Sequence, residues 1–172
     1  TKMIRQSTSA ENEDQAEVIL KYKKNRRTLI YHEEGVWRPI TIQNKGKNVT
    51  IREVLEISSD GQVIRSYVQG KSIIVQRNKK NHEWEKAVFK IGNDEVTPEE
   101  FGEMSIDGRF VSIRLKNNER IVMQQQEDGQ WQPWVLNIDG HDKRLLQLYI
   151  KSLGKQNMLV QVDDGTWKII HR

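Results

Sequence analysis

Two groups of basic side chains have the type and spacing to bind an anionic ligand. They lie at residues 21–27 and 77–80, and their members are Lys21, Lys23, Lys24, Arg26, Arg27, Arg77, Lys79 and Lys80. Cationic side chains grouped in this way contact phosphate oxygens, and such contacts dominate the affinity of proteins for nucleic acids. If the fold brings the two groups together, we expect one binding surface for a nucleic acid or another polyanion. The simpler interpretation is a pair of solvated charged segments.

Trp134 is the tryptophan that we would select for ligand binding. An exposed indole ring stacks on a sugar or a base, whereas a buried ring anchors a core. Three other tryptophans recur every 47 residues, at Trp37, Trp84 and Trp131. Their recurrence favours a structural role. Trp134 differs because the corresponding positions of the other copies hold Ile40 and Ala87, so its large ring belongs to one copy alone.

The sequence carries no recognisable motif for catalysis or for metal binding. Its histidines lie in or beside turns without the spacing of paired ligands, and they are His32, His82, His141 and His171. The segment Asp139-Gly140-His141-Asp142 has the composition of a cation loop, but a turn leading into a helix is the simpler interpretation. The chain has no cysteine, which excludes thiolate chemistry and disulfides. We therefore expect a non-enzymatic protein without a cofactor or a metal.

Composition and charge set broad limits on the class of protein. The 172 residues are 35% hydrophobic and 30% charged, and no apolar run reaches the roughly 18 residues that span a bilayer. We expect a soluble protein without membrane insertion. The formal charge of +4 and the pI near 9.2 favour anionic partners through a weak long-range field. The lack of cysteine favours the cytoplasm, with a processed secreted form as the alternative.

An internal repeat is the most informative pattern in the chain. The phrase Val49-Thr50-x-x-Glu53-Val54 returns as Val96-Thr97-x-x-Glu100-Phe101, and the later Asp60-Gly61 pair returns as Asp107-Gly108, always 47 residues on. Repetition at such a period is typical of folds in which each copy buries its apolar face against its neighbours. We place the units at residues 37–83, 84–130 and 131–166, the third being shorter.

The elements within each unit are expected to be short β-strands. From residue 28 onward, alternating apolar runs are separated by turn dipeptides such as Asp128-Gly129 and Asp164-Gly165, which is typical of an all-β domain. The repeated Thr-x-x-Glu phrase matches a capping box, so we expect one helical turn after Thr50 and another after Thr97. The Asp-Gly pairs at residues 60 and 107 are expected to close tight turns into the next strands.

The predicted architecture is an all-β domain at residues 28–172, preceded by a disordered tail and a charged amphipathic helix within residues 1–27. The helix is expected over residues 9–25, because acidic residues precede basic ones as the helix dipole favours. The repeats favour a trefoil-like closure ahead of a propeller-like or open meander arrangement. We expect strands within residues 28–36 and 167–172 to pair and close the domain.

The sequence supports two functional hypotheses, neither of them enzymatic. The first is an interaction module that contacts another protein, an assembly or further copies of itself, because repeat β folds commonly present surfaces. The second is a nucleic-acid or polyanion binding domain that uses the two basic groups. Trp134 is the additional binding candidate in either case.

Overall fold

The computed structural model describes the backbone of residues 2–6, 17–23, 26–149 and 157–171, and the side chains of residues 31–149 and 157–171. In this part of the chain the protein is all-β, with no helix. No helix with the length and apolar character to cross a membrane occurs in the same residues. The chain divides into two compact units, Thr1–Ala87 and Val88–Arg172, which are described separately.

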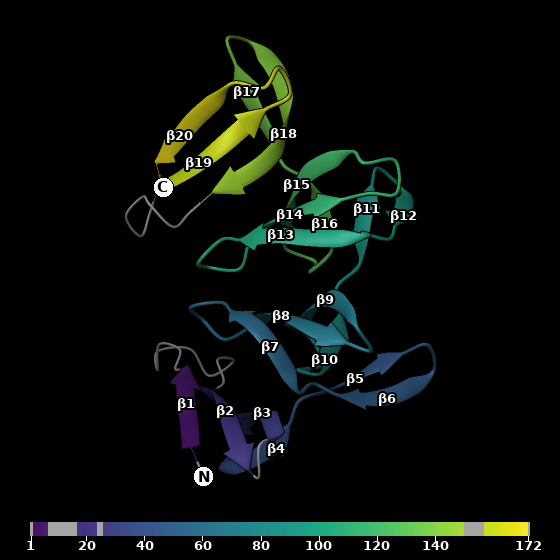
Figure 1. Ribbon diagram of the computed structural model, residues 1–172, viewed down its shortest axis with the longest axis vertical. Coiled ribbons are helices and arrows are strands. Elements are labelled where there is room, and N and C mark those ends of the chain that lie inside the picture. The colour runs from purple at the N-terminus through teal and green to yellow at the C-terminus, as the bar shows by residue number, and fades with distance from the viewer. Residues whose placement is uncertain (1, 7–16, 24–25, 150–156, 172) are drawn as a thin grey trace. The chain divides into compact units, whose positions relative to one another are not determined.

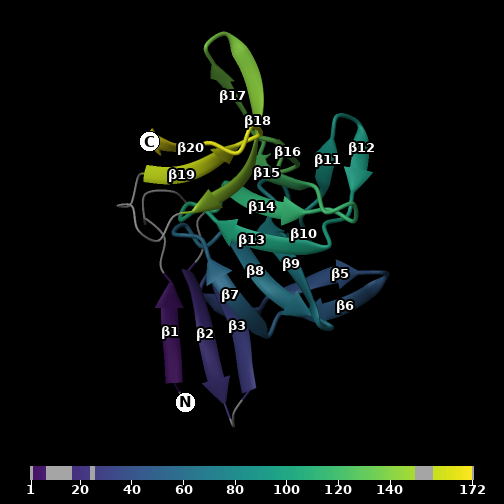
Figure 2. The same ribbon diagram turned by 45° about the horizontal axis from the view of Figure 1, so that its top comes forward.

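The first unit contains two four-stranded antiparallel sheets and one hairpin (Figures 1 and 2). The first sheet follows chain order and comprises β1 (Lys2–Gln6), β2 (Glu17–Lys23), β3 (Arg26–Glu33) and β4 (Val36–Pro39). The hairpin comprises β5 (Thr41–Asn44) and β6 (Lys47–Thr50). The second sheet also follows chain order, with β7 (Glu53–Ile57), β8 (Val63–Val68), β9 (Lys71–Arg77) and β10 (Trp84–Lys86).

The second unit contains a six-stranded and a four-stranded sheet. The six-stranded sheet comprises β11 (Phe89–Ile91), β12 (Asp94–Val96), β13 (Glu100–Met104), β14 (Phe110–Arg114), β15 (Arg120–Gln125) and β16 (Trp131–Pro133). Its last four strands form a meander in chain order, and β11 joins β16 in parallel at Phe89 and Trp131. The four-stranded sheet comprises β17 (Val135–Ile138), β18 (His141–Tyr149), β19 (Asn157–Val162) and β20 (Trp167–His171).

The three short hairpins share one register. Ile42 faces Val49 across β5 and β6, Phe89 faces Val96 across β11 and β12, and Leu136 faces Lys143 across β17 and β18. Both partners advance by 47 residues from one pair to the next. The repeated phrase in the sequence therefore coincides with equal backbone pairing.

The predicted tight turns at the Asp-Gly pairs are present, and a buried serine organises each of them. The hydroxyl of Ser58 donates a hydrogen bond to the Asp60 carboxylate at 2.6 Å and accepts one from the Val63 backbone N–H at 3.0 Å. Gly61 occupies the left-handed region, with φ of 72°. Ser105 repeats the arrangement, with hydrogen bonds of 2.7 Å to Asp107 and 3.0 Å from Phe110.

The predicted helical turns after Thr50 and Thr97 are wrong. Glu53–Ile57 is strand β7 and Glu100–Met104 is strand β13. Each strand contains a bulge where its pairing with the next strand shifts, between Val54 and Glu56 and between Phe101 and Met104. An extra residue in a strand places positions i and i+3 on one face. The apolar spacing therefore imitates the period of a helix.

The predicted helix over residues 9–25 is also wrong at Glu17–Lys23, which forms strand β2; residues 9–16 and 24–25 lie outside the described residues. Seven residue pairs join β2 to β3, which runs across the boundary expected between residues 27 and 28. A charge distribution that matches the helix dipole favours a helix only weakly, and backbone pairing over seven residues outweighs this preference.

The predicted pairing of the first and last strands is absent. Both edges of β3, which contains Leu29–Tyr31, are occupied by β2 and β4, and β20 pairs with β19. The three four-stranded sheets are meanders in chain order, the connectivity used by propeller blades. The expected closure does not form because each end strand already pairs with its nearest neighbours in the sequence.

Each unit has its own apolar core. In the first unit Ile42, Ile64, Val75 and Trp84 are buried together, and Tyr31 packs against them. The core of the second unit lies between the β13–β16 meander and the β17–β20 sheet; its buried members are Phe110, Val122, Trp134, Leu145, Leu148, Met158, Val160 and Val162. Strand alternation places these side chains inward and polar neighbours outward.

Candidate functional site

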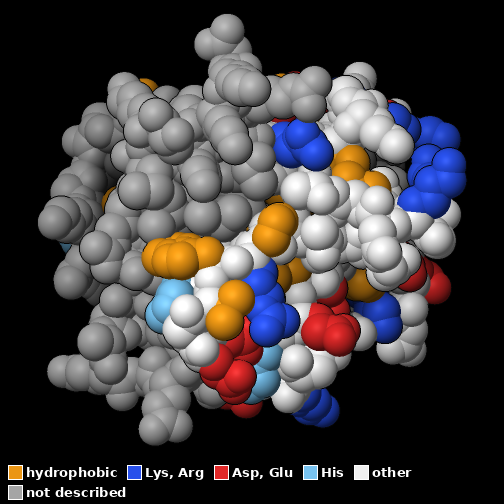
Figure 3. All heavy atoms as spheres, turned by 90° about the horizontal axis from the view of Figure 1, so that it is seen from below, with side chains coloured by type: hydrophobic (Ala, Val, Ile, Leu, Met, Phe, Trp, Pro, Cys, Tyr) orange, Lys and Arg blue, Asp and Glu red, His pale blue; other side chains and the backbone are white. Residues whose placement is uncertain are grey.

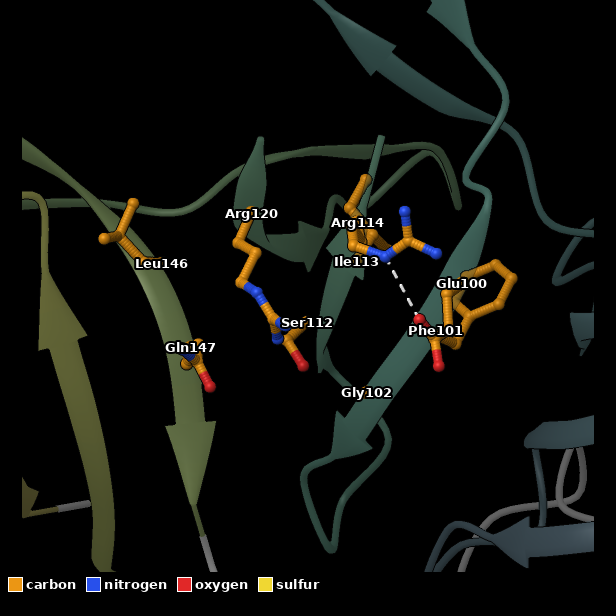
Figure 4. Close-up of a pocket in the computed structure, with 9 residues that line it drawn as sticks. All are labelled: Glu100, Phe101, Gly102, Ser112, Ile113, Arg114, Arg120, Leu146 and Gln147. Atoms are coloured by element: carbon orange, nitrogen blue, oxygen red, sulfur yellow. Dashed lines mark hydrogen bonds and ion pairs between the residues drawn. The ribbon is translucent and has the colours of Figure 1, made fainter. Parts of the chain in front are cut away.

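A polar groove opens in the second unit between the β13–β15 meander and β18 (Figure 4). Its open volume is about 360 Å³. The lining residues are Glu100, Phe101, Gly102, Ser112, Ile113, Arg114, Arg120, Leu146 and Gln147. Two of them are arginines and one is a glutamate, so the groove carries net positive charge.

The two arginines of the groove are direct neighbours across the sheet. Arg114 at the end of β14 faces Arg120 at the start of β15 in the antiparallel register. The Arg114 side chain has two hydrogen-bond partners. Its Nε donates to the Glu100 carboxylate at 3.1 Å, and its Nη1 donates to the Asn118 side-chain oxygen at 3.1 Å. Among the described residues Arg120 has no hydrogen bond or ion pair. Its side chain extends toward Ser112 (Figure 4).

The floor of the groove depends on Gly102 in the bulge of β13. A Cβ atom at this position would lie 2.2 Å from the Ser112 Oγ, well inside any real contact. Ser112 itself is 8% exposed, and its hydroxyl has no hydrogen-bond partner among the residues that the structure describes. Because Gly102 has no side chain, its backbone lies close to Ser112, and the unpaired Ser112 hydroxyl lies at the bottom of the groove.

The corresponding positions of the first unit, 47 residues earlier in β7 and β8, are filled differently. Leu55 replaces Gly102 and Arg65 replaces Ser112, and Arg65 forms an ion pair with Glu56 across the bulge. The pair Tyr67 and Ser72 faces across β8 and β9 where the second unit has its two arginines. The glycine, the serine and the two arginines that line the groove in the second unit are therefore absent from the corresponding positions of the first unit.

Arg77, the first member of the second basic group, is a buried structural residue. Its guanidinium lies 2.8 Å from the Glu33 carboxylate with 4% of the side chain exposed, and its Nε donates to the His82 carbonyl at 3.2 Å. The guanidinium carbon lies 5.8 Å from the centre of the Tyr31 ring. Burial, followed by the nearby Glu33 carboxylate, raises the pKa of Tyr31, and Arg77 acts in the opposite direction.

The other predicted cations divide between described and undescribed side chains. Lys79 and Lys80 are exposed in the turn between β9 and β10. Lys21 and Lys23 lie in β2, and Arg26 and Arg27 in β3, with side chains outside the described set; Lys24 lies outside the described residues altogether. On the face seen in Figure 3, the described Lys and Arg side chains are interspersed with Asp and Glu.

Trp134, the predicted aromatic ligand-binding residue, lies in the core of the second unit. It is 8% exposed, and its ring centre is 4.2 Å from that of Phe110. The enlarged side chain fills space between two sheets. In the described part of the chain no group of three or more His, Cys, Asp or Glu side chains is arranged to hold a metal ion.

A second surface feature is an apolar row on the outer face of the β17–β20 sheet. Tyr149, Leu159 and Ile169 face one another in register across β18, β19 and β20. Tyr149 and Ile169 are 43% and 51% exposed, and Trp167, on the same face two residues before Ile169, is 46% exposed. The sequence contains these residues, but their common face depends on the register of three strands.

Sequence analysis missed both the groove and the apolar row. Arg114 and Arg120 could be placed opposite each other only after the length of the β14–β15 loop was known. No protein-family model, no curated protein and no solved structure matches this chain. The functional conclusions below therefore depend on the geometry of these residues alone.

Proposed function

We propose that the chain is a non-enzymatic β-repeat interaction module that assembles with a second copy of itself through the outer face of the β17–β20 sheet. In this proposal the three units of the sequence, two of 47 residues and a shorter third, are copies of one meander. Each copy places a tryptophan near the start of the strand that follows a turn. We assign the outer face of the β17–β20 sheet as the surface that contacts the partner.

One observation supports this proposal above the others: equivalent tryptophans differ in how they are covered. Trp84 and Trp131 are 7% and 0% exposed, whereas Trp37 and Trp167 are 41% and 46% exposed. Of the two exposed rings, that of Trp167 continues into the apolar row that ends at Ile169. A contiguous exposed apolar patch on a soluble protein typically marks an interaction site.

The chain also shows what covers such a tryptophan. The ring of Trp84 packs edge-on against Tyr31, at 5.8 Å between centres, and Tyr31 belongs to the neighbouring β1–β4 sheet. A sheet of the same type therefore complements this kind of tryptophan face. A second copy of the chain supplies sheets of that type, which is why we select it as the occupant over an unrelated protein.

The expected association is weak and concentration-dependent. A specific interface usually buries more than roughly 1,000 Å² in total, and burial of apolar surface contributes about 25 cal/mol per Å² before the cost of association. The row formed by Tyr149, Leu159, Ile169 and Trp167 supplies the apolar centre of such an interface. Aromatic residues at the centre commonly dominate binding energy.

Sedimentation velocity over a range of protein concentrations tests the proposal. We expect a reversible shift from monomer to dimer, and we expect Trp167→Thr combined with Ile169→Thr to abolish it. Ile106→Thr is the matched control, because Ile106 is 47% exposed in the turn that precedes β14. A protein that stays monomeric at every concentration, or whose association survives the double substitution, would contradict the proposal.

A nucleic-acid or polyanion binding function is the alternative, supported by the exposed Lys79 and Lys80. Contacts to phosphate are steeply salt-dependent. We expect a gel shift with generic DNA, RNA or heparin that weakens at higher salt and after Lys79→Glu with Lys80→Glu. Absence of retardation even at low salt would rule out this alternative and leave the self-assembly proposal unaffected.

A further inference from the structure

We infer that the groove over Gly102 and Ser112 is a binding site for a small oxyanion, a carboxylate or a phosphate group, held by Arg120 and Arg114. This inference is independent of the self-assembly proposed above. The site uses the groove between β13, β14, β15 and β18, and no residue of the apolar row takes part.

The charges at the groove are incompletely balanced by the described residues. Arg114 and Arg120 face each other directly across two antiparallel strands, and like charges in that relation destabilise a sheet. The Glu100 carboxylate lies beside Arg114, 3.1 Å from its Nε, and among the described groups no carboxylate is paired with Arg120. The Arg114 guanidinium turns toward Glu100 and that of Arg120 toward Ser112 (Figure 4), so an anion beside Arg120 would offset the repulsion and form charge-assisted hydrogen bonds.

The lower part of the groove supplies a neutral donor. Ser112 is about nine-tenths buried, and its hydroxyl is unpaired among the described residues although it lines the groove. The Arg120 side chain extends over this hydroxyl (Figure 4), so one oxyanion can accept from the guanidinium and from the Ser112 O–H together.

The groove is open because of the side chains specific to this copy. A Cβ at Gly102 would lie 2.2 Å from the Ser112 Oγ, so replacing this glycine would force the Ser112 hydroxyl to rotate away. In the first unit, the corresponding Leu55 and the ion-paired Arg65 occupy the equivalent places. A groove lined by two guanidinium groups and one hydroxyl matches the acceptor geometry of a small oxyanion.

NMR titration of the whole chain with inorganic phosphate and, separately, with acetate tests the site at constant ionic strength. We expect saturable shifts of the Gly102 amide and of the Arg120 and Arg114 Nε–H signals at millimolar concentrations, which correspond to roughly 4 kcal/mol of binding free energy. Stronger binding in one arm identifies that class, phosphate or carboxylate, as the natural ligand group.

Two variants decide whether these shifts report the groove. We expect Arg120→Gln to weaken binding by about tenfold, the effect of one charge-assisted hydrogen bond. Lys116→Gln makes the same change in charge at an exposed position of the same β14–β15 loop, and we expect it to leave binding unchanged. Shifts that do not saturate with either anion, or an equal loss in both variants, would overturn the inference. Arg120 is exposed, so its replacement is compatible with folding, which the amide spectrum verifies.

Discussion

Replacement of the turn serines provides a sharp quantitative prediction. Ser58→Ala and Ser105→Ala each remove one buried hydroxyl that forms a short hydrogen bond with an aspartate and accepts one from a strand N–H. Both serines are almost completely buried, at 0% and 2% exposure. The two changes therefore remove the same two hydrogen bonds from two turns of one form. Ser105→Ala also removes a bond of 3.1 Å from the Arg109 backbone N–H, which retains the Asp107 carboxylate as an acceptor.

The expected cost follows from those contacts. The side-chain bond to the carboxylate contributes about 1–2 kcal/mol, and a buried backbone donor that loses its acceptor costs about 1–3 kcal/mol. We expect each substitution to lower the free energy of unfolding by about 2–5 kcal/mol in total. The two values should agree within about 0.5 kcal/mol, and in the double variant they should add.

Urea unfolding followed by residue-resolved hydrogen exchange is the appropriate assay, because each unit then reports its own stability. Thr97→Ala is the matched control, since Thr97 is exposed and precedes a strand; we expect a change below about 0.5 kcal/mol. A helix cap at Thr97 would instead cost about 1 kcal/mol. If Ser105→Ala costs no more than this control, or differs from Ser58→Ala by more than about 1.5 kcal/mol, the equivalence of the two turns is refuted.

Three further substitutions test the roles assigned above. Arg77→Gln leaves the Glu33 carboxylate without its buried guanidinium, and we expect chemical denaturation to show a loss of about 2–4 kcal/mol in the free energy of unfolding. An unchanged free energy would contradict a buried structural role for Arg77. We expect Trp134→Ala to lower the free energy of unfolding, measured by thermal unfolding, by about 3–5 kcal/mol. An unchanged stability would instead support the ligand-binding role expected from the sequence. The hydroxyl and then the backbone N–H of Thr166 hold the pKa of Asp164 below its usual range. Because the folded protein favours the charged Asp164 carboxylate, this group stabilises the fold above about pH 4, and that stabilisation is lost as the pH falls further. A carboxyl titration by NMR should show Thr166→Val raising the pKa of Asp164, and an unchanged value would contradict this cause.

The sequence predicted the all-β class and the turns at the Asp-Gly pairs. These features depend on local residues: Gly61 adopts a positive φ, and the flanking apolar residues alternate. The helical turns were mispredicted because a bulge gives a strand the i, i+3 spacing of a helix, as Val54 and Ile57 show on either side of the bulge in β7.

The candidate sites could not be predicted from the sequence, for a different reason. A charge cluster says nothing about burial, so Arg77 could not be distinguished from Lys79 until the Glu33 contact was visible. The groove requires the pairing of β14 with β15, and the apolar row requires the registers of β18, β19 and β20. Contacts between residues separated along the chain are set by loop lengths and register, which residue types alone do not specify.

Isotope-filtered NOE measurements on a mixture of labelled and unlabelled protein test directly whether a second copy of the chain covers the outer face of the β17–β20 sheet. If it does, we expect intermolecular NOEs from the Ile169 methyl groups and from the Tyr149 and Trp167 rings, and we expect them to grow with protein concentration. Intermolecular NOEs confined to other surfaces, or none at any concentration, would contradict it.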